Sequence, residues 1–252
     1  MKTHLFRMEC LTDLHVGNGE ANYSIIDNEV QKDTVLHDVP IIHASGVKGA
    51  LREFLERIWG KEDAKNADAR IKTIFGDKDG AGGYKFFTAM CLARPLRVTD
   101  GAAPYVLATS GAVLKHFSGL LKGLGRSDVY DKAIGELTDG ATIEVEGKVV
   151  TMKNSSAAEP LIAQSFAVFD DLQDYALPVR ARNVLDDNGL SKNLWYEELV
   201  PHESIFFLAV IVPDDDNNYH AFQEAVQKSA VQFGGNASIG NGYTTIREVY
   251  PL

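Results

Sequence analysis

The sequence predicts an α+β fold built on a ferredoxin-like sheet with helices on one face. Three observations support this class. The chain opens with a strand, a turn, a short strand and a helix, and it closes with a strand, a helix, a glycine-rich loop and a strand. Two such halves can combine into one sheet. The length of 252 residues leaves room for insertions between the halves without a second full domain.

The N-terminal half begins with a predicted strand over residues 2–12, in which apolar and polar residues alternate. A glycine-containing turn follows at 13–20, and residues 22–32 have the composition of a short strand that is broken at Asp27-Asn28. The helix predicted over 46–59 carries apolar residues at the i, i+3, i+4 spacing of one buried face.

The start of this helix is a candidate anion-binding site. Ser45 is a good N-cap candidate, and Lys48 and Arg52 lie one turn apart beside the apolar stripe. A helix N-terminus presents unpaired N–H groups and the positive end of the helix dipole, which together favour a phosphate. The run is not a Walker A loop, since it lacks the longer glycine-bounded stretch and the Lys-Ser/Thr pair. The alternative is an ordinary amphipathic helix with solvated basic residues.

Insertions of mixed structure are expected between the two halves. Residues 61–84 are polar apart from the apolar island 71–75, which favours a surface helix and a loop. The other elements predicted here are a strand over 86–96, a helix over 109–124 weakened by Gly119 and Gly123, a hairpin over 141–151 that turns at Glu146-Gly147, and a protruding hairpin with arms at 177–185 and from 194 onward. The Asn188-Gly189 pair at the tip of the protruding hairpin is a strong reverse-turn signal.

The C-terminal half is predicted to contain a buried strand over 204–212, a helix over 217–231 and a final strand over 243–249. The loop at 233–242 carries four glycines, which are Gly234, Gly235, Gly240 and Gly242. Such a loop can bring its backbone close to a ligand and present N–H groups to a phosphate. A flexible connection before the last strand is the alternative.

The composition restricts the class of protein. A net charge of −10 argues against nucleic-acid binding over the whole surface, although a local basic groove can lie on an acidic body. Two cysteines are too few for a disulfide framework or a zinc site. No apolar run approaches the roughly 20 residues that span a bilayer, and the N-terminus lacks the apolar core of a signal peptide. We therefore expect a cytoplasmic protein with no membrane partner.

The sequence pattern leaves open the roles of two further residues, Asp27 and His15. Asp27 follows two β-branched residues and precedes an asparagine, so its carboxylate can be a metal ligand or a proton acceptor. A turn-forming aspartate is the commoner explanation. His15 can act as a general base or stack on a nucleobase, and a histidine packed at the end of a strand is the alternative.

Stretches at both ends of the chain are similar to the motifs of one known family. Residues 11–19 match its opening L-T-x-x-H-x-G-x-G, and residues 26–52 are similar to its V-D-x-P-I-Q-R-E and P-G-S-S-L-K-G segment. Residues 194–201 and 234–242 resemble its L-W-Y-E-E-x-x-P and G-G-x-x-T-x-G-x-G motifs. The chain thus resembles the RAMP superfamily of CRISPR-associated proteins, and more narrowly the repeated backbone subunit of the type III-B (Cmr) effector complex.

This resemblance implies one RAMP domain over residues 1–252. Its parts would be a ferredoxin-like palm of the RNA-recognition-motif type at about 1–60 and 200–252, insertions at about 61–175, and a thumb hairpin at about 180–194. Several copies would stack helically along a CRISPR guide RNA, together with other effector subunits. The thumb would displace a base pair of the guide–target duplex at regular intervals.

The resemblance also implies site residues. The RNA-binding residues that we predict are His15, Ser45, Gly46, Lys48, Arg52, Arg180, Arg182, Gly234, Gly235, Gly240 and Gly242. The cleaving aspartate of the family corresponds to Asp27, which would act with a divalent metal ion, Mg²⁺, in cutting target RNA. The neighbouring 2′-hydroxyl would attack, with the distorted strand supplying in-line geometry.

The sequence departs from the family pattern at several places. His43-Ala44 stand where the family has Pro-Gly, Gly46 replaces the second serine, and Glu29 replaces a proline. None of these changes removes the aspartate. The alternatives are a catalytically silent RNA-binding scaffold subunit and a stand-alone guide-processing nuclease that uses histidine chemistry. A nucleotide-dependent metabolic enzyme is disfavoured, because the sequence carries neither a Walker nor a dinucleotide fingerprint.

Overall fold

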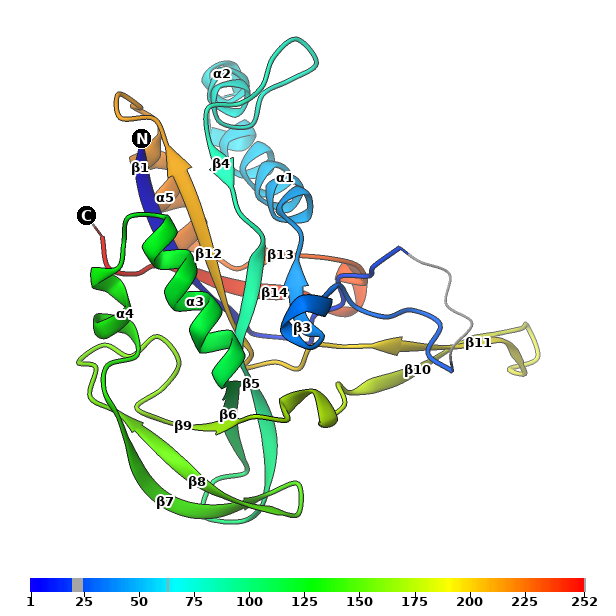
Figure 1. Ribbon diagram of the computed structural model, residues 1–252. Helices are drawn as coiled ribbons and strands as arrows, with labels where there is room; N and C mark the ends of the chain where they lie inside the picture. Colours follow the sequence, from blue (N-terminus) through cyan, green and yellow to red (C-terminus); the bar gives the residue numbers. More distant parts are fainter. Residues whose placement is uncertain (20–24, 63, 252) are drawn as a thin grey trace.

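The computed structural model describes residues 1–19, 25–62 and 64–251. Its centre is a run of four antiparallel strands in the order β14-β1-β12-β5 (Figure 1). Helix α1 lies in the chain between β1 and β5, and helix α5 lies between β12 and β14. These elements are β1 (Lys2–Cys10), α1 (Ala44–Glu62), β5 (Ala89–Asp100), β12 (Ile205–Val212), α5 (Tyr219–Lys228) and β14 (Tyr243–Glu248). The predicted α+β class is confirmed.

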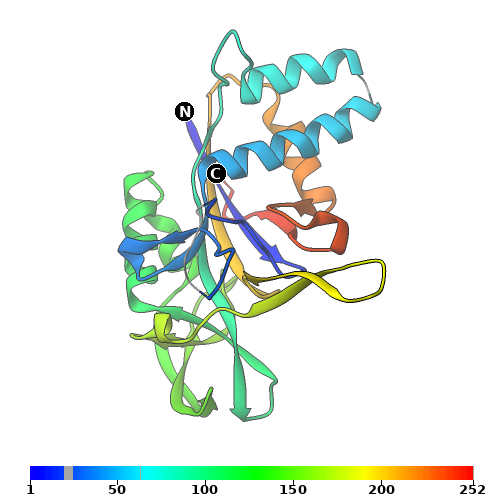
Figure 2. The ribbon, with the colours of Figure 1, turned by 90° about the vertical axis from the view of Figure 1, so that its right-hand side faces the viewer.

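Helices cover both faces of this sheet. Strand β12 is apolar at every position and almost wholly buried, so neither of its faces can be left to water. Helices α1, α2 and α5 lie on one side of it, and α3 and α4 lie on the other (Figure 2). The added bounds are α2 (Ala64–Phe75), α3 (Gly111–Gly123) and α4 (Asp128–Ala133). The helices of the two halves, α1 and α5, thus share one face as the sequence predicts, and α3 and α4 of the inserted region cover the other face.

Helix α1 begins earlier than the sequence predicts. The backbone N–H of Val47 donates to the carbonyl of His43 at 3.0 Å, which places His43 immediately before the helix. Ser45 lies within the first turn, so its prediction as the N-cap is wrong. His43 is itself fixed by its N–H, which donates to the Gln31 side-chain oxygen at 2.8 Å. The helix start is thus anchored to the segment that follows Asp27.

The inserted region builds a second, smaller core. Strand β7 pairs with both β8 and β5, so the strands β5-β6-β9-β8-β7 close on themselves. The side chains inside this ring include Leu96, Val106, Met152 and Phe169. The ring adds β6 (Tyr105–Ser110), β7 (Leu137–Val145), β8 (Lys148–Ser155) and β9 (Ser165–Phe169). Closure removes the free edges that an inserted hairpin would otherwise expose.

The remaining elements are short, apart from the protruding hairpin β10–β11. They are β2 (Lys32–Asp33), β3 (Val39–Ile42), β4 (Lys85–Phe86), β10 (Val179–Leu185), β11 (Ser191–Glu198), β13 (Val231–Gln232) and the 3₁₀ turns η1 (Thr34–Leu36), η2 (Leu172–Asp174) and η3 (Ala237–Ile239). No helix among the described residues is both long and apolar enough to cross a bilayer.

Most predicted elements are confirmed, and two kinds of error remain. Strands β6 and β9 and helix α4 were not predicted, because they are short. Strands β6 and β9 contribute apolar residues to a ring that only tertiary pairing creates, and α4 packs Val129 and Ala133 into the main core. Within the predicted strand 22–32, residues 22–24 lie outside the described residues. The rest contributes isolated bridges at Asn28 and Val30 and the two-residue β2.

A buried polar cluster joins the ends of β1 and β14. His4 Nδ1 lies 2.7 Å from Glu248 Oε1, and both side chains are more than nine-tenths buried. Gln223 on α5 also donates to the Glu248 carboxylate. Burial by itself raises the pKa of Glu248, but its interactions with His4, Tyr219 and Gln223 outweigh burial and leave that pKa below its usual value.

We expect Glu248→Gln to lower the free energy of unfolding at pH 7 by about 1–3 kcal/mol, since it removes a charged acceptor from a buried pair. The lowered pKa means that the carboxylate stabilises the fold above about pH 4.5 and that this contribution is lost as pH falls through the folded-state pKa. Urea unfolding at pH 7 and near pH 3.5 should show the difference between variant and wild type shrinking in acid. Glu224→Gln, at an exposed position on α5, is the control. A difference in the free energy of unfolding between variant and wild type that is equal at both pH values would contradict this account.

Candidate nucleic-acid interface

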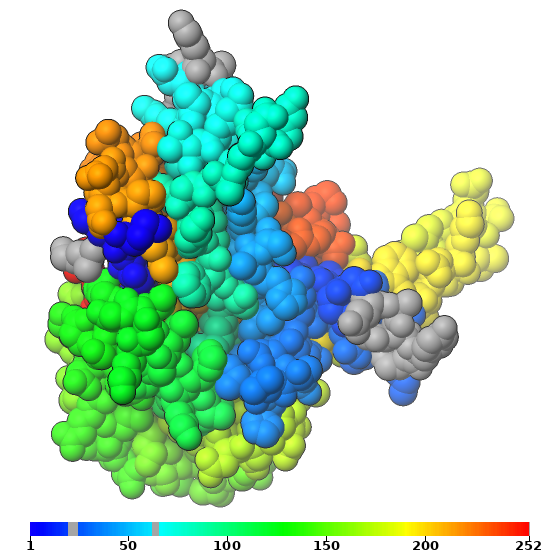
Figure 3. All heavy atoms as spheres, turned by 45° about the horizontal axis from the view of Figure 1, so that its top comes forward, coloured from blue at the N-terminus to red at the C-terminus, as the bar shows by residue number. Residues whose placement is uncertain are grey.

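The hairpin β10–β11 projects from the body of the molecule (Figures 1 and 3). Its strands form a two-stranded sheet apart from the main sheet, and its outer part exposes Val184, Leu185, Leu190 and Leu194. A lone two-stranded hairpin is marginally stable in water. Its orientation must therefore be fixed at the base, which is where the buried polar contacts of this region lie.

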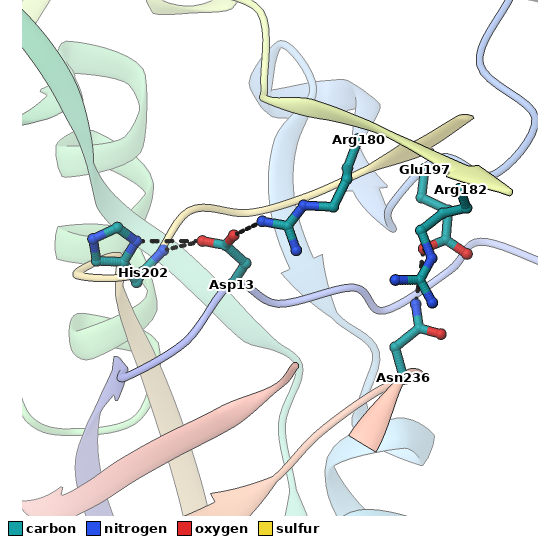
Figure 4. A network of polar contacts seen from close by, with 6 residues as sticks. All are labelled: Asp13, Arg180, Arg182, Glu197, His202 and Asn236. Atoms are coloured by element: carbon teal, nitrogen blue, oxygen red, sulfur yellow. Dashed lines mark hydrogen bonds and ion pairs between the residues drawn. The ribbon is translucent and has the colours of Figure 1, made fainter. Parts of the chain in front are cut away.

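Glu197, near the end of β11, ties the hairpin to the glycine-rich loop. Its carboxylate is buried and accepts hydrogen bonds from Trp195 Nε1 and Asn236 Nδ2, each at 2.9 Å. Arg182 Nε, on the facing strand, lies 3.6 Å from the same carboxylate (Figure 4). Three donors from two parts of the chain thus compensate one buried charge.

Glu198, the next residue, ties the hairpin to the segment that carries Asp27. Its buried carboxylate accepts the backbone N–H of Val30 at 3.1 Å and the ammonium of Lys32 at 2.8 Å. The neighbouring backbone pairs as well, since Asn28 N–H donates to Tyr196 O and Glu198 N–H donates to Asn28 O. The segment around Asp27 is therefore held along the inner edge of the hairpin.

Asp13, in the turn after β1, makes a third link to the hairpin. Arg180 Nη2 donates to its carboxylate at 2.6 Å, and His202 approaches through its backbone N–H at 3.1 Å and through Nδ1 at 3.3 Å (Figure 4). Arg180 and Arg182, the two arginines predicted to bind RNA, thus both form ion pairs that fix the base of the hairpin. Arg180 remains about half exposed.

Asp27 lies on the surface at this base. Its Oδ2 accepts the backbone N–H of Tyr196 at 2.7 Å, which fixes the carboxylate against β11. No group of three or more His, Cys, Asp or Glu side chains in the described part of the chain is arranged to hold a metal ion. A Mg²⁺ ion commonly uses only one or two carboxylates together with water and phosphate oxygens. Asp27 therefore fits as one ligand of an ion that RNA phosphates help to hold, and not as part of a protein-only site.

The basic residues at the start of α1 differ in their availability. Arg52 Nη1 donates to the Gly76 carbonyl at the end of α2 at 3.0 Å, and its Nε pairs with Glu56 at 2.8 Å. Lys48 makes no hydrogen bond or ion pair with any described residue, and Ser45 and Gly46 beside it are exposed. The first turn of α1 thus presents Lys48, whereas Arg52 joins two helices.

The glycine-rich loop packs its backbone directly onto the 13–17 turn. The N–H of Gly235 donates to His15 O at 2.8 Å, and that of Gly242 donates to Asp13 O at 2.9 Å. A Cβ at Gly234 would overlap the His15 carbonyl, and one at Gly242 would overlap the Phe233 carbonyl. These glycines allow close contact within the protein, and the N–H groups named here are already in use.

His15 is a buried anchor at the centre of this contact. Its side chain is almost wholly buried, and its Nδ1 lies 2.8 Å from the Glu198 carbonyl oxygen. That carbonyl can only accept, so Nδ1 carries the proton of this hydrogen bond. Contact between His15 and RNA stays a prediction, and burial leaves little of the ring for stacking on a base.

Sequence reasoning missed the residues that assemble the site. Asp13, Glu197, Glu198 and Asn236 were not named as site residues, because acidic and amide side chains near loops are usually solvated. The signal available was the placement of two adjacent glutamates directly after an apolar and aromatic run, where a strand enters the core.

Comparisons with known proteins agree with this architecture. The family model for the RAMP superfamily matches residues 7–245. The chain is 27% identical over 296 residues to the CRISPR system Cmr endoribonuclease Cmr4 of Pyrococcus furiosus, covering 99% of this chain and 97% of that protein.

Two solved structures show the same fold over nearly the whole chain. One is a cryo-EM structure of the type III-B Cmr-beta complex bound to cognate target RNA, with a TM-score of 0.81 and 22% identity over 98% of this chain and 97% of that one. The other is a crystal structure of oligomeric Cmr4 from Pyrococcus furiosus, with a TM-score of 0.67 and 23% identity over 100% of both chains.

The close packing of the loop predicts different costs for two glycine substitutions. Gly234→Ala adds a methyl group where the His15 carbonyl lies and also strains a φ of +75°. Gly240→Ala strains a φ of +85° but meets only open space. We expect about 1–2 kcal/mol of destabilisation at Gly240 from backbone strain alone, and roughly 2 kcal/mol more at Gly234. Chemical denaturation of both variants measures this, and equal losses would show that the close contact does not matter.

Proposed function

Because this chain belongs to the RAMP superfamily, we propose that it is a guide-RNA-binding backbone subunit of a type III-B CRISPR ribonucleoprotein that cleaves complementary target RNA. The relative that it matches along its whole length is named as a Cmr endoribonuclease. Its fold is that of a chain in a Cmr complex bound to target RNA. We further propose that it acts in the cytoplasm with other copies of itself and with other effector subunits.

The placement of Asp27 is the observation that carries this proposal. A carboxylate fixed by the Tyr196 N–H lies at the inner base of a hairpin that reaches away from the body. A strand of RNA that is pushed aside by the hairpin would pass this carboxylate. Regular spacing of copies along a guide would then place one such carboxylate at each displaced nucleotide.

The guide is held by the start of α1 in this proposal. Lys48 and the exposed N–H groups of the first helical turn form a local positive site on a chain whose net charge is −10. A local positive site of this kind would let an acidic protein bind a polyanion. Phosphate contacts of this kind fix position without reading sequence.

Cleavage would proceed by attack of the 2′-hydroxyl on the adjacent phosphorus, breaking the P–O5′ bond. The products are a 2′,3′-cyclic phosphate and a free 5′-hydroxyl. Displacing the nucleotide allows the attacking and leaving oxygens to come into line, and the Asp27 carboxylate can accept the hydroxyl proton. A divalent cation, with Mg²⁺ as the candidate, would neutralise charge that develops on the phosphate.

We expect Asp27→Asn to abolish cleavage of a guide-complementary RNA by the reconstituted complex, with a loss of about 100-fold or more, while RNA binding is retained. The readout is a ladder of regularly spaced products bearing 5′-hydroxyl ends, measured with Mg²⁺ and with EDTA. Asp215→Asn, at an exposed position outside the hairpin, is the matched control. Unchanged cleavage in the Asp27 variant would make the chain a catalytically silent scaffold, and undiminished cleavage in EDTA would remove the metal from the proposal.

Substitutions of Lys48 and Arg52 should have different effects, the first on guide binding and the second on the stability of the fold. Lys48→Met is expected to weaken guide binding by about five- to tenfold and to lower the slope of log K against log salt by about one, because one phosphate contact is lost. Arg52→Met should chiefly lower the melting temperature, since it loses its contacts with Gly76 and Glu56. Filter binding at several salt concentrations, with thermal unfolding in parallel, tests both. A larger loss of binding at Arg52 than at Lys48 would reverse the assignment.

A further inference from the structure

Gln31 lies in the chain between the two sites that the proposed function assigns to cleavage and to guide binding. It follows Asp27 by four residues and precedes by twelve His43, the residue immediately before helix α1. Since an extended chain spans at most about 3.6 Å per residue, the Cα atoms of Asp27 and Gln31 are separated by no more than roughly 14 Å. None of the steps proposed above uses Gln31.

Both ends of the Gln31 side-chain amide make hydrogen bonds. Its Oε1 accepts the backbone N–H of His43 at 2.8 Å, and its Nε2 donates to the carbonyl of Gly17 at 3.1 Å. Because a backbone N–H can only donate and a carbonyl can only accept, these partners allow one orientation of the amide. The side chain of Gln31 therefore links the start of α1 to the end of the 13–17 turn.

The backbone of Gln31 is bonded to the same two parts of the chain. Its N–H donates to Val16 O at 2.8 Å, and its carbonyl accepts the N–H of Ile41, on β3, at 2.9 Å. The bonds to Ile41 and His43 hold two points, two residues apart, on the chain that enters α1. One point alone would act as a pivot, whereas two points define the direction in which the chain enters the helix.

The other end of the segment holds the carboxylate. Asn28 N–H donates to Tyr196 O at 3.1 Å, and Glu198 N–H donates to Asn28 O at 2.9 Å. The Tyr196 N–H in turn donates to Asp27 Oδ2 at 2.7 Å. The short segment is thus fixed to the hairpin at its first residues and to the start of α1 at Gln31, so this residue determines where Asp27 lies relative to the helix.

We propose that Gln31 is a positioning residue that sets the distance between the guide and the cleaving carboxylate. It acts through the start of α1 on one side and through Asp27 on the other, and its role requires no contact with the RNA. A displacement of about 1 Å can cost as much as about 100-fold in rate. Two hydrogen bonds of one side chain can therefore control cleavage without contributing to binding. This inference rests on the proposed function, in which α1 holds the guide and Asp27 acts on the target.

The exposure of the Gln31 amide separates positioning from stability. Both of its side-chain hydrogen bonds lie at the exposed surface. Water can therefore bond to the His43 N–H and the Gly17 carbonyl when the amide is removed, so the fold should persist. Water molecules do not hold these two groups at a fixed separation, and the geometry that the amide imposes is lost.

The test is cleavage of a guide-complementary RNA by the reconstituted complex, measured over a range of target concentrations. Methionine has a length close to that of glutamine and no amide. We expect Gln31→Met to lower the maximal rate about tenfold, while the target concentration at half-maximal rate changes by less than about twofold. The cleavage positions should also spread to neighbouring nucleotides, which a loss of stability alone would not cause.

Two further variants make the test specific. Gln31→Glu keeps an acceptor for the His43 N–H and loses the donor to Gly17, so its maximal rate should lie between those of Gln31→Met and the wild type. Gln173→Met, at an exposed position on η2, is the matched control and should cleave as the wild type does.

The outcomes distinguish this inference from the proposed function. If Asp27→Asn abolishes cleavage while Gln31→Met keeps the rate and the product positions of the wild type, the positioning role is wrong and the proposed function stands. Weaker target binding by Gln31→Met at an unchanged maximal rate also overturns the positioning role. If Gln31→Met does not assemble, Gln31→Glu decides by the same two readouts. Absence of cleavage by the wild-type complex overturns both.

Discussion

The buried glutamate pair Glu197–Glu198 is the constraint on which the arrangement of the site depends. Two adjacent carboxylates are removed from water at the end of β11, and each must find donors to offset its desolvation. Glu197 finds them on the hairpin and on the glycine-rich loop, and Glu198 finds them on the segment after Asp27. One pair of charges thus brings together three parts of the chain that are far apart in sequence.

Close packing of the backbone explains the positions of the glycines in the loop 233–242. The loop 233–242 approaches the 13–17 turn so closely that side chains at Gly234 and Gly242 would overlap backbone carbonyls. The loop then offers its N–H groups to His15 and Asp13, and Asn236 at its start reaches Glu197. A glycine-rich loop beside a binding surface can therefore serve assembly of that surface, and its N–H groups are not automatically free for a ligand.

The basic side chains differ in whether the protein supplies them with partners. Three arginines are bonded to acidic or carbonyl groups and hold elements of the fold together; they are Arg52, Arg180 and Arg182. Lys48, in contrast, has no partner among the described residues. The number of basic residues therefore says little about where anions bind; the balance of partners around each one decides it.

The sequence by itself determined the order of most elements, the buried character of β12, the protruding hairpin with its turn at Asn188-Gly189, and the family. These features depend on local spacing and turn chemistry, or on motifs that are contiguous in the chain. Only the tertiary structure decided that helices cover both faces, that β5 to β9 close into a ring, that α1 starts at Ala44, and that His15 is an anchor. It also decided which charges are paired, as the links of Glu197 and Asp13 to the hairpin show. The physical reason is that burial and pairing depend on residues far apart in the chain, whose approach no local pattern encodes.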